Sequence, residues 1–134
     1  MRKMLFTVPN GIFSKASMVV SFGWSGKDIY KELTTKCKKS DPEIAGIEKL
    51  EIPKRGEGNF FFTDKGFYLC HLAEWDGSID SYGTLTHELV HAAQYLLHKR
   101  GAATVDEAGI SETLAYQVGY WYTEILQRIR SKKK

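Results

Sequence analysis

The stretch that decides the fold covers residues 84–98 and reads TLTHELVHAAQYLLH. On an α-helix, at about 100° per residue, its apolar residues gather on one side and its polar residues form a separate stripe. The apolar side consists of Leu85, Leu89, Ala92, Ala93, Leu96 and Leu97, and the polar stripe consists of His87, His91, Gln94 and His98. No proline or glycine interrupts the stretch. The pattern therefore predicts a helix that packs on a core and presents histidines on a second face.

Two of these histidines have the spacing of metal ligands. His87 and His91 are four residues apart, so a helix places them one turn apart on the same face. Glu88 follows His87 directly and can reach a water molecule bound to the same metal. Two neutral imidazoles, a third protein ligand and a bound water form a catalytic zinc site with the glutamate as general base. The competing interpretation is a solvated helix face that carries these three residues by chance.

A third ligand must come from elsewhere in the chain. The candidates downstream of the motif are His98, Asp106, Glu107 and Glu112. His98 lies on the same helix, roughly 10 Å further along at about 1.5 Å per residue, so it cannot bind the same ion. Gly101, preceded by two basic residues, predicts the end of this helix.

A second helix is predicted from about residue 106 or 110 to about residue 130. Asp106 is a suitable N-cap, because its side chain can accept a hydrogen bond from the first turn. Glu107 falls in that first turn, where an acid is stabilised by the helix dipole. Neither residue therefore needs a metal to explain its position.

Glu112 lies on the side of this second helix away from the main apolar stripe, and that placement by itself favours exposure to solvent. The stripe consists of Ile110, Leu114, Val118, Trp121 and Ile125. On the side of Glu112, Ala115 and Gly119 are small enough to let another helix approach closely. Glu112 is therefore either turned toward the histidine helix or an ordinary exposed acid.

The motif His87-Glu88-x-x-His91, followed by Glu112 on a later helix, resembles the gluzincin class of zinc metallopeptidases. It is most similar to the smallest members, the single-domain minigluzincins and related phage or bacterial proteins. The resemblance covers about residues 60 to 130. It implies that zinc is bound by His87, His91 and Glu112. Glu88 is then the general base.

The chain departs from that class at one position. Larger gluzincins often carry an acid four residues after the ligand glutamate, where it orients a ligand histidine, and this chain has Tyr116 there. The Tyr116 hydroxyl could replace that acid or could face the substrate. The other large zincin class extends the motif with a glycine and a third histidine. Gln94 and Leu97 occupy those positions here, so that class is set aside.

The resemblance predicts a peptidase in which Glu88 takes a proton from a zinc-activated water and passes it to the leaving amine. A further donor should stabilise the oxyanion, and the candidates are Tyr116, Tyr120, His98 and His71. Tyr116 is the first choice because it shares the helix face of Glu112. Three alternatives remain open: a regulatory or binding protein of this fold with weak or partner-specific catalysis, a protease that works near DNA, and a metal-free α+β domain.

Length and composition predict one globular domain, residues 1–134, with 43% hydrophobic and 26% charged residues. The two cysteines, Cys37 and Cys70, are too few for a disulfide framework, and we expect Cys70 to be a core thiol. Five positive charges lie in the last seven residues without interleaved aromatics, a pattern that argues against nucleic acid as a partner. With no signal-peptide core and no apolar run of about 20 residues, we expect a cytoplasmic protein that acts on peptides or proteins and not at membranes.

The remaining sequence patterns predict an α+β fold. Strands are predicted at 3–8 and 17–23, a helix at 25–39 with Ser25 as N-cap, a short helix within 43–49, a hairpin formed by 58–63 and 66–72, and a loop at 73–82. We therefore expect a zincin-like single domain, in which a small, mostly antiparallel sheet carries its helices on one face. By the resemblance, the strand at 67–72 runs along the active-site cleft and pairs with the substrate backbone.

Overall fold

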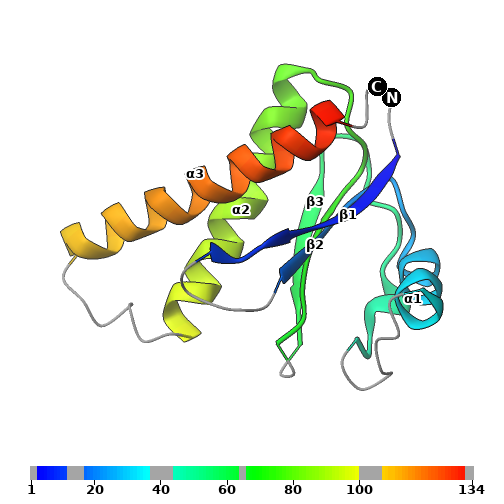
Figure 1. The fold of residues 1–134 in the computed structure, drawn as a ribbon. Helices are drawn as coiled ribbons and strands as arrows, with labels where there is room; N and C mark the ends of the chain where they lie inside the picture. The colour runs from blue at the N-terminus through cyan, green and yellow to red at the C-terminus, as the bar shows by residue number, and fades with distance from the viewer. Residues whose placement is uncertain (1–2, 12–16, 37–43, 64–65, 100–106, 132–134) are drawn as a thin grey trace.

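The structure is a computed structural model that describes residues 3–11, 17–36, 44–63, 66–99 and 107–131, with the side chains of 107–111 outside the description. Figure 1 presents the arrangement of its elements. In chain order these are β1 (Met4–Pro9), β2 (Ser17–Phe22), α1 (Gly26–Thr35), the 3₁₀ helix η3 (Ile47–Lys49), β3 (Gly58–Phe62), β4 (Tyr68–Leu72), α2 (Ile79–Lys99) and α3 (Glu107–Ser131). The α+β class predicted from the sequence is confirmed.

The four strands form one mixed sheet in the order β1-β2-β4-β3. The β1–β2 and β3–β4 pairs are antiparallel, as the predicted hairpin requires, whereas β2 and β4 are parallel. The strand expected to receive a substrate backbone, β4, is therefore paired on both sides. That expectation is wrong for β4, because its N–H and C=O groups are used within the sheet. Within the described part of the chain β3 pairs only with β4, so the open edge beside α2 belongs to β3.

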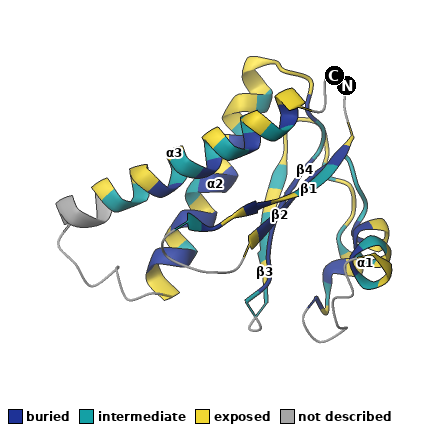
Figure 2. Cartoon of the chain, viewed as in Figure 1, coloured by how far each residue is buried: buried dark blue, intermediate teal, exposed yellow. Residues whose placement is uncertain are grey.

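Helices cover both faces of the sheet, which corrects the expectation of a single covered face. The central strands β2 and β4 are almost completely buried (Figure 2). Alternate residues of these strands contribute to two separate cores. One core lies between the sheet, α2 and α3, and includes Met18, Val20, Phe22, Leu85, Leu89, Trp121 and Ile125. The other lies between the sheet, α1 and η3, and includes Val19, Ile29, Leu33, Ile44, Ile47 and Leu69.

The start of α1 agrees with the sequence prediction. Ser25 is the N-cap, and its side chain accepts a hydrogen bond from the Asp28 amide at 3.1 Å. Ile29 and Leu33, one turn apart, are both buried against the sheet. The helix ends at Thr35, and Cys37 lies outside the described residues.

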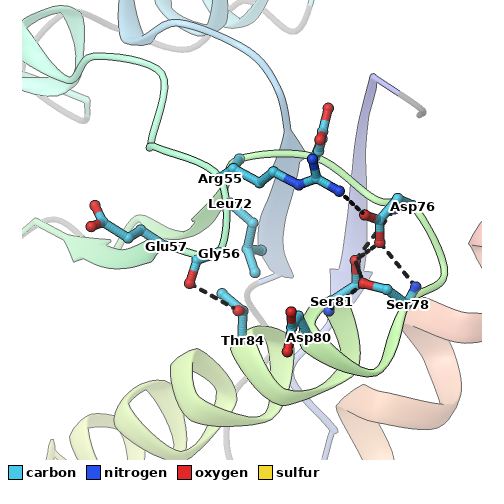
Figure 3. A pocket seen from close by; sticks show the side chains of 11 residues that line it. Arg55, Gly56, Glu57, Leu72, Asp76, Ser78, Asp80, Ser81 and Thr84 are labelled. Atoms are coloured by element: carbon cyan, nitrogen blue, oxygen red, sulfur yellow. Dashed lines mark hydrogen bonds and ion pairs between the residues drawn. The ribbon is translucent and has the colours of Figure 1, made fainter.

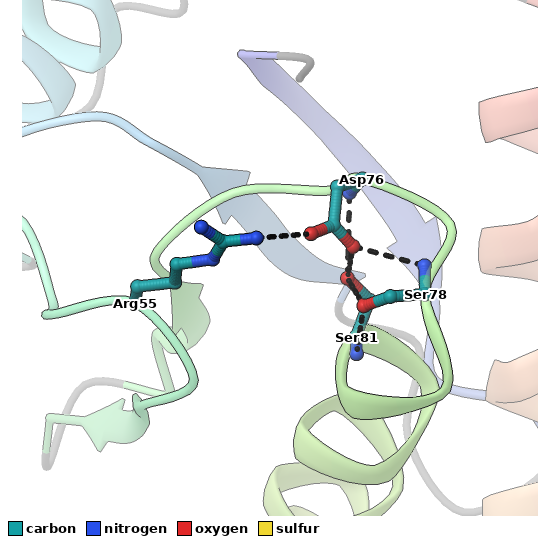
Figure 4. A network of polar contacts seen from close by, with 4 residues as sticks. All are labelled: Arg55, Asp76, Ser78 and Ser81. Atoms are coloured by element: carbon teal, nitrogen blue, oxygen red, sulfur yellow. Dashed lines mark hydrogen bonds and ion pairs between the residues drawn. The ribbon is translucent and has the colours of Figure 1, made fainter.

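The helix α2 begins at Ile79, earlier than predicted, so the last part of the expected loop at 73–82 is helical. A polar network at its start explains the difference (Figure 4). The Ser81 amide donates to the Ser78 hydroxyl at 3.2 Å, and the Ser78 amide donates to Oδ1 of Asp76 at 2.9 Å. The Ser81 hydroxyl also donates to Oδ1 of Asp76, and Nη2 of Arg55 lies 3.6 Å from Oδ2. Hydrogen bonds from Ser78 and Ser81 hold the pKa of Asp76 below its usual range.

The helix α3 is anchored by its C-terminal part. Of the predicted apolar stripe, Trp121 and Ile125 are buried in the core and Leu114 and Val118 are partly buried against it, while the side chain of Ile110 lies outside the described part. The Trp121 indole N–H donates to the backbone carbonyl of Pro9 at 3.1 Å. The side-chain amide of the buried Gln117 donates to the backbone carbonyl of Asn10, also at 3.1 Å. These contacts attach α3 to the end of β1 from residue 117 onward. The proposed N-cap Asp106 lies outside the described residues.

No helix in the described ranges combines the length and the apolar character that crossing a membrane would require.

Candidate metal centre

The two motif histidines lie on the exposed side of α2, and their ring nitrogens converge. Nε2 of His87 and Nε2 of His91 are 3.2 Å apart. Two imidazole ligands at 2.0–2.1 Å from one tetrahedral zinc ion would have their nitrogens about 3.3 Å apart. The opposite side of α2 is buried over all six apolar residues of the motif helix, as the sequence predicts. The helix therefore holds both imidazoles in an arrangement that fits one metal ion.

Glu88 is more buried than its sequence position suggests, with only 5% of its surface exposed. It lies beneath the first residue of β3, because a Cβ added to Gly58 would stand 3.1 Å from Glu88 Cγ. Burial raises the pKa of Glu88, while His87 and His91 act in the opposite direction. A carboxyl group with a raised pKa beside two imidazoles is well suited to accept and return a proton.

Cys70 approaches this carboxyl group from the sheet but belongs to the core. It is fully buried, and burial, with a smaller contribution from the Glu88 charge, raises the pKa of its thiol. The thiolate form that a metal requires is therefore disfavoured. The sequence prediction of a core thiol is confirmed.

A groove between β3 and α2 contains these groups. Its middle part is lined by Glu57, Gly58, Thr84, His87 and Glu88. On one side it continues into a hollow of about 410 Å³ that also includes His91, Phe60, Phe62 and Tyr95. That volume falls within the range of small ligand sites in proteins. The histidine pair therefore faces an open groove along the unpaired strand edge.

On its other side the groove continues to the start of α2, where several acidic side chains line it (Figure 3). The lining includes Glu57, Glu74, Asp76 and Asp80, with Arg55 as the basic residue among them. The Thr84 hydroxyl donates to the Gly56 carbonyl at 3.1 Å and so connects α2 to the segment that leads into β3. This bond lies one helical turn before the metal motif. It holds the strand and the helix together beside the histidines.

Glu112 is exposed on α3, and its helix face is open. Ala115 on the same face is exposed, and nothing lies within 4 Å of a Cβ placed on Gly119. The expectation that these small residues pack against another helix is therefore wrong for this structure. Across the described ranges, no group of three histidine, cysteine or acidic side chains is arranged to hold a metal ion. Two imidazoles thus fit zinc, and the described structure does not bring Glu112 to them.

The candidates for oxyanion stabilisation are also dispersed. Tyr116 is 56% exposed and, with Tyr120, lines a separate hollow on α3. His71 is buried on the opposite face of the sheet, where its Nε2 lies 2.7 Å from the Trp24 carbonyl oxygen, so its candidacy is wrong. His98 is exposed near the end of α2.

Two features of the groove escaped the sequence analysis. Tyr95 lies on α2 one turn after His91, and its position four residues downstream could have indicated a shared face. Phe60 and Phe62 line the groove from β3. Their contribution depends on β3 being the edge strand next to α2, and no local sequence pattern carries that information.

Comparison with models of protein families, with curated proteins and with solved structures finds no match for this chain.

Proposed function

We propose that this protein is a zinc-dependent metallopeptidase in which His87, His91 and Glu112 bind the metal. The observation that carries the proposal is the pair of imidazole nitrogens 3.2 Å apart, next to a buried carboxyl group, in a groove along the outer edge of β3. A chance arrangement of histidines on a solvated helix would not require the adjacent glutamate to be buried against the sheet. The fold is consistent with this function but is not specific for it.

Glu88 is the general base of the proposed reaction. When bound, zinc would polarise the scissile carbonyl and make a water molecule acidic enough to react near neutral pH. Glu88 accepts the proton of that water and delivers it to the leaving amine. Its position beneath β3 and directly after His87 holds the carboxyl group beside the proposed metal, where it can carry the proton between the two sites.

The substrate backbone is proposed to pair with β3. We propose β3 and not β4, because the outer edge of β3, on the side of α2, has no partner among the described strands. An extended peptide added there gains backbone hydrogen bonds and passes directly over the groove that contains His87, Glu88 and His91. The scissile bond would then lie close to Gly58, which sits above Glu88.

Glu112 completes the metal site if the first turns of α3 move toward α2. The fully buried residues of α3 begin at Gln117, Leu114 is partly buried against the core, and Glu112, Ala115 and Tyr116 are exposed. A shift of this part would have to keep or replace the contact of Leu114 with the core. Tyr116 lies one turn after Glu112 and would move with it, which would place its hydroxyl nearer the groove. The metal would thus supply the driving force for the last step of site assembly.

Metal content tests the ligand set. We expect about one zinc per chain in the wild-type protein, a strong loss of affinity in His87→Ala and Glu112→Ala, and no change in His98→Ala. His98 is the matched control, since it is an exposed histidine of the same helix outside the proposed ligand set. Mass spectrometry of trace metals and calorimetric zinc titration would measure both quantities. Full affinity in Glu112→Ala would exclude it as a ligand, and wild-type zinc binding in His87→Ala would reject the site.

One observation favours a second function. Because Glu112 lies apart from the histidines, this protein could be a zincin-like binding or regulatory protein whose site is completed only by one partner. A zinc-loaded protein that hydrolyses no generic peptide would support this alternative. Measurable hydrolysis that requires both zinc and Glu88 would support the peptidase.

A further inference from the structure

The two ends of the groove differ in chemistry. At the His91 end, Phe60 and Phe62 project from β3 on the same side as Gly58, because alternate residues of a strand share a face. Phe62 stacks on Tyr95 of α2, with ring centroids 3.9 Å apart and an interplanar angle of 25°. The ring centroid of Phe60 lies 5.9 Å from that of Tyr95. Strand and helix therefore build one aromatic surface beside the histidine pair.

This aromatic surface is only partly covered. Phe62 is 44% exposed, although Phe60 and Tyr95 also pack on the core behind it. An exposed phenylalanine at the rim of a groove keeps apolar surface in contact with water, and a ligand that covers it gains free energy. At the opposite end the lining includes four acidic residues and no aromatic residue, and Asp76 there is engaged in capping α2. Only the His91 end therefore offers an aromatic contact surface.

We infer that the groove selects extended peptides that carry a large apolar or aromatic side chain on the His91 side of the scissile bond. The inference rests on the proposed function and names the substrate class of the same site. Phe60 and Phe62 lie two and four residues after Gly58, roughly 7 and 13 Å along a strand at about 3.3 Å per residue. A substrate paired with β3 presents its side chain to them two to four residues from the bond above Glu88. Phe62 is then a specificity-determining residue, with no role in the chemical step.

The geometry also explains why the occupant is a peptide strand and not a compact apolar molecule. The hollow is lined by β3, whose outer edge has no partner among the described strands, so backbone donors and acceptors lie beside the aromatic rings. An extended chain satisfies both kinds of surface at once, because it pairs through its backbone and covers the rings with a side chain. A small apolar ligand would leave the polar edge without compensation.

The test uses zinc-loaded full-length protein and a series of capped octapeptides made of serine and glycine with one varied residue, Phe, Leu, Ala or Asp. The varied residue is moved along the peptide to cover both sides of any cleaved bond. Cleavage is followed by mass spectrometry as kcat/KM. Binding of the same peptides, labelled with a fluorophore, is measured by anisotropy on zinc-loaded Glu88→Gln. The variants are Phe62→Ala and, as a matched control, Ile52→Ala, which removes a similarly exposed apolar side chain outside the groove.

We expect the Phe and Leu peptides to be cleaved at least about tenfold more efficiently than the Ala peptide, as for one apolar side chain entering an apolar site. The preference should hold on one side of the bond only. In Phe62→Ala, kcat/KM for the Phe peptide should exceed that for the Ala peptide by no more than about threefold. In Ile52→Ala the ratio of these two kcat/KM values should equal that of the wild-type protein. Circular dichroism and zinc content would verify that both variants are folded.

The outcomes separate the two proposals. Equal cleavage of the Phe and Ala peptides by the wild-type protein would overturn the inference and leave the peptidase standing, with no need for any variant. If no peptide is cleaved, preferential binding of the Phe peptide that is lost in Phe62→Ala would support the groove specificity while the proposed function fails. Equal binding of all four peptides would overturn the inference in that case.

Discussion

At the scale of single residues, the position of Glu88 distinguishes this site from an ordinary histidine-bearing helix. A solvated glutamate would have an ordinary pKa, whereas Glu88 is covered by β3 and its pKa is raised. Cys70 behind it remains a neutral thiol for the same reason, because burial disfavours the charged form. The Glu88 carboxyl group and the Cys70 thiol both contact the core, but we assign a role in the site only to Glu88. Only Glu88 also lines the groove.

The substitution Glu88→Gln tests the role of this carboxyl group. The amide has nearly the same shape, so the protein should fold and retain zinc through its histidines. Activity should fall by about two to four orders of magnitude, the scale for loss of a general base. Calorimetric zinc titration and kcat/KM would be measured on the same preparation. Wild-type rates would reject the hydrolytic mechanism, and loss of zinc would instead make Glu88 part of the metal-binding structure.

At the scale of elements, β3 and α2 meet most closely where a glycine faces a glutamate. A Cβ at Gly58 would lie 3.1 Å from both Glu88 Cγ and the His71 carbonyl oxygen. Backbone cannot yield easily at this distance, but the Glu88 side chain can rotate. The contact thus explains how the edge strand positions the proposed base.

We predict that Gly58→Ala displaces Glu88 and lowers kcat by about tenfold or more, as small misplacements of catalytic groups do. Zinc affinity should change little, because neither proposed histidine ligand is among the nearest contacts of the added Cβ. Lys54→Ala is the control, since Lys54 is exposed in the segment that leads to β3 and is not among the residues that line the groove. A Gly58→Ala protein with wild-type kcat would show that the close approach has no functional effect.

The open face of α3 gives a second prediction at this scale. Gly119 lies within a helix, and a Cβ added there would meet nothing within 4 Å. Gly119→Ala should therefore stabilise the zinc-free protein by about 0.5–1 kcal/mol, because alanine loses less conformational entropy in a helix. Urea denaturation would measure the change. Destabilisation would mean that another helix does approach this face, which is one of the two arrangements that the sequence left open for Glu112.

At the scale of the whole molecule, two cores on opposite faces of one sheet bury a histidine away from the groove. His71 is fully buried, and its Nδ1 has no hydrogen-bond partner among the described residues. Burial lowers the pKa of His71 from its ordinary value of 6.5, with the Trp24 carbonyl opposing this shift. The folded protein therefore keeps this ring neutral at pH values where the unfolded chain binds a proton.

This difference predicts acid sensitivity. As pH falls below about 6.5, the unfolded state takes up a proton at His71 that the folded state does not, so the free energy of unfolding decreases until the lower folded pKa is reached. His71→Gln should flatten this dependence between about pH 5 and 7. Urea denaturation with a chelator present would measure it without metal-linked protons. If the free energy of unfolding of His71→Gln changes with pH as steeply as that of the wild-type protein, the acid sensitivity belongs to other groups.

The amino-acid sequence alone determined the features that depend on local pattern. The two faces of α2, the Ser25 cap, the hairpin of β3 and β4, and the apolar stripe of α3 from Trp121 onward all agree with prediction. Helical and strand periodicity follow from backbone geometry within a few residues, so such features can be read without knowledge of the fold. The early start of α2 was missed because its cap uses Asp76 and Ser78 jointly in a segment that resembles a turn.

Only the tertiary structure decided which elements lie side by side. That β3 forms the edge next to α2, that Gly58 covers Glu88, and that Phe62 meets Tyr95 all depend on the strand order β1-β2-β4-β3. Strand order is set by the free energy of contacts between distant segments, and periodicity reports only which face of an element is apolar. The exposure of Glu112 has the same origin, because α3 docks through Gln117 and Trp121 on the end of β1.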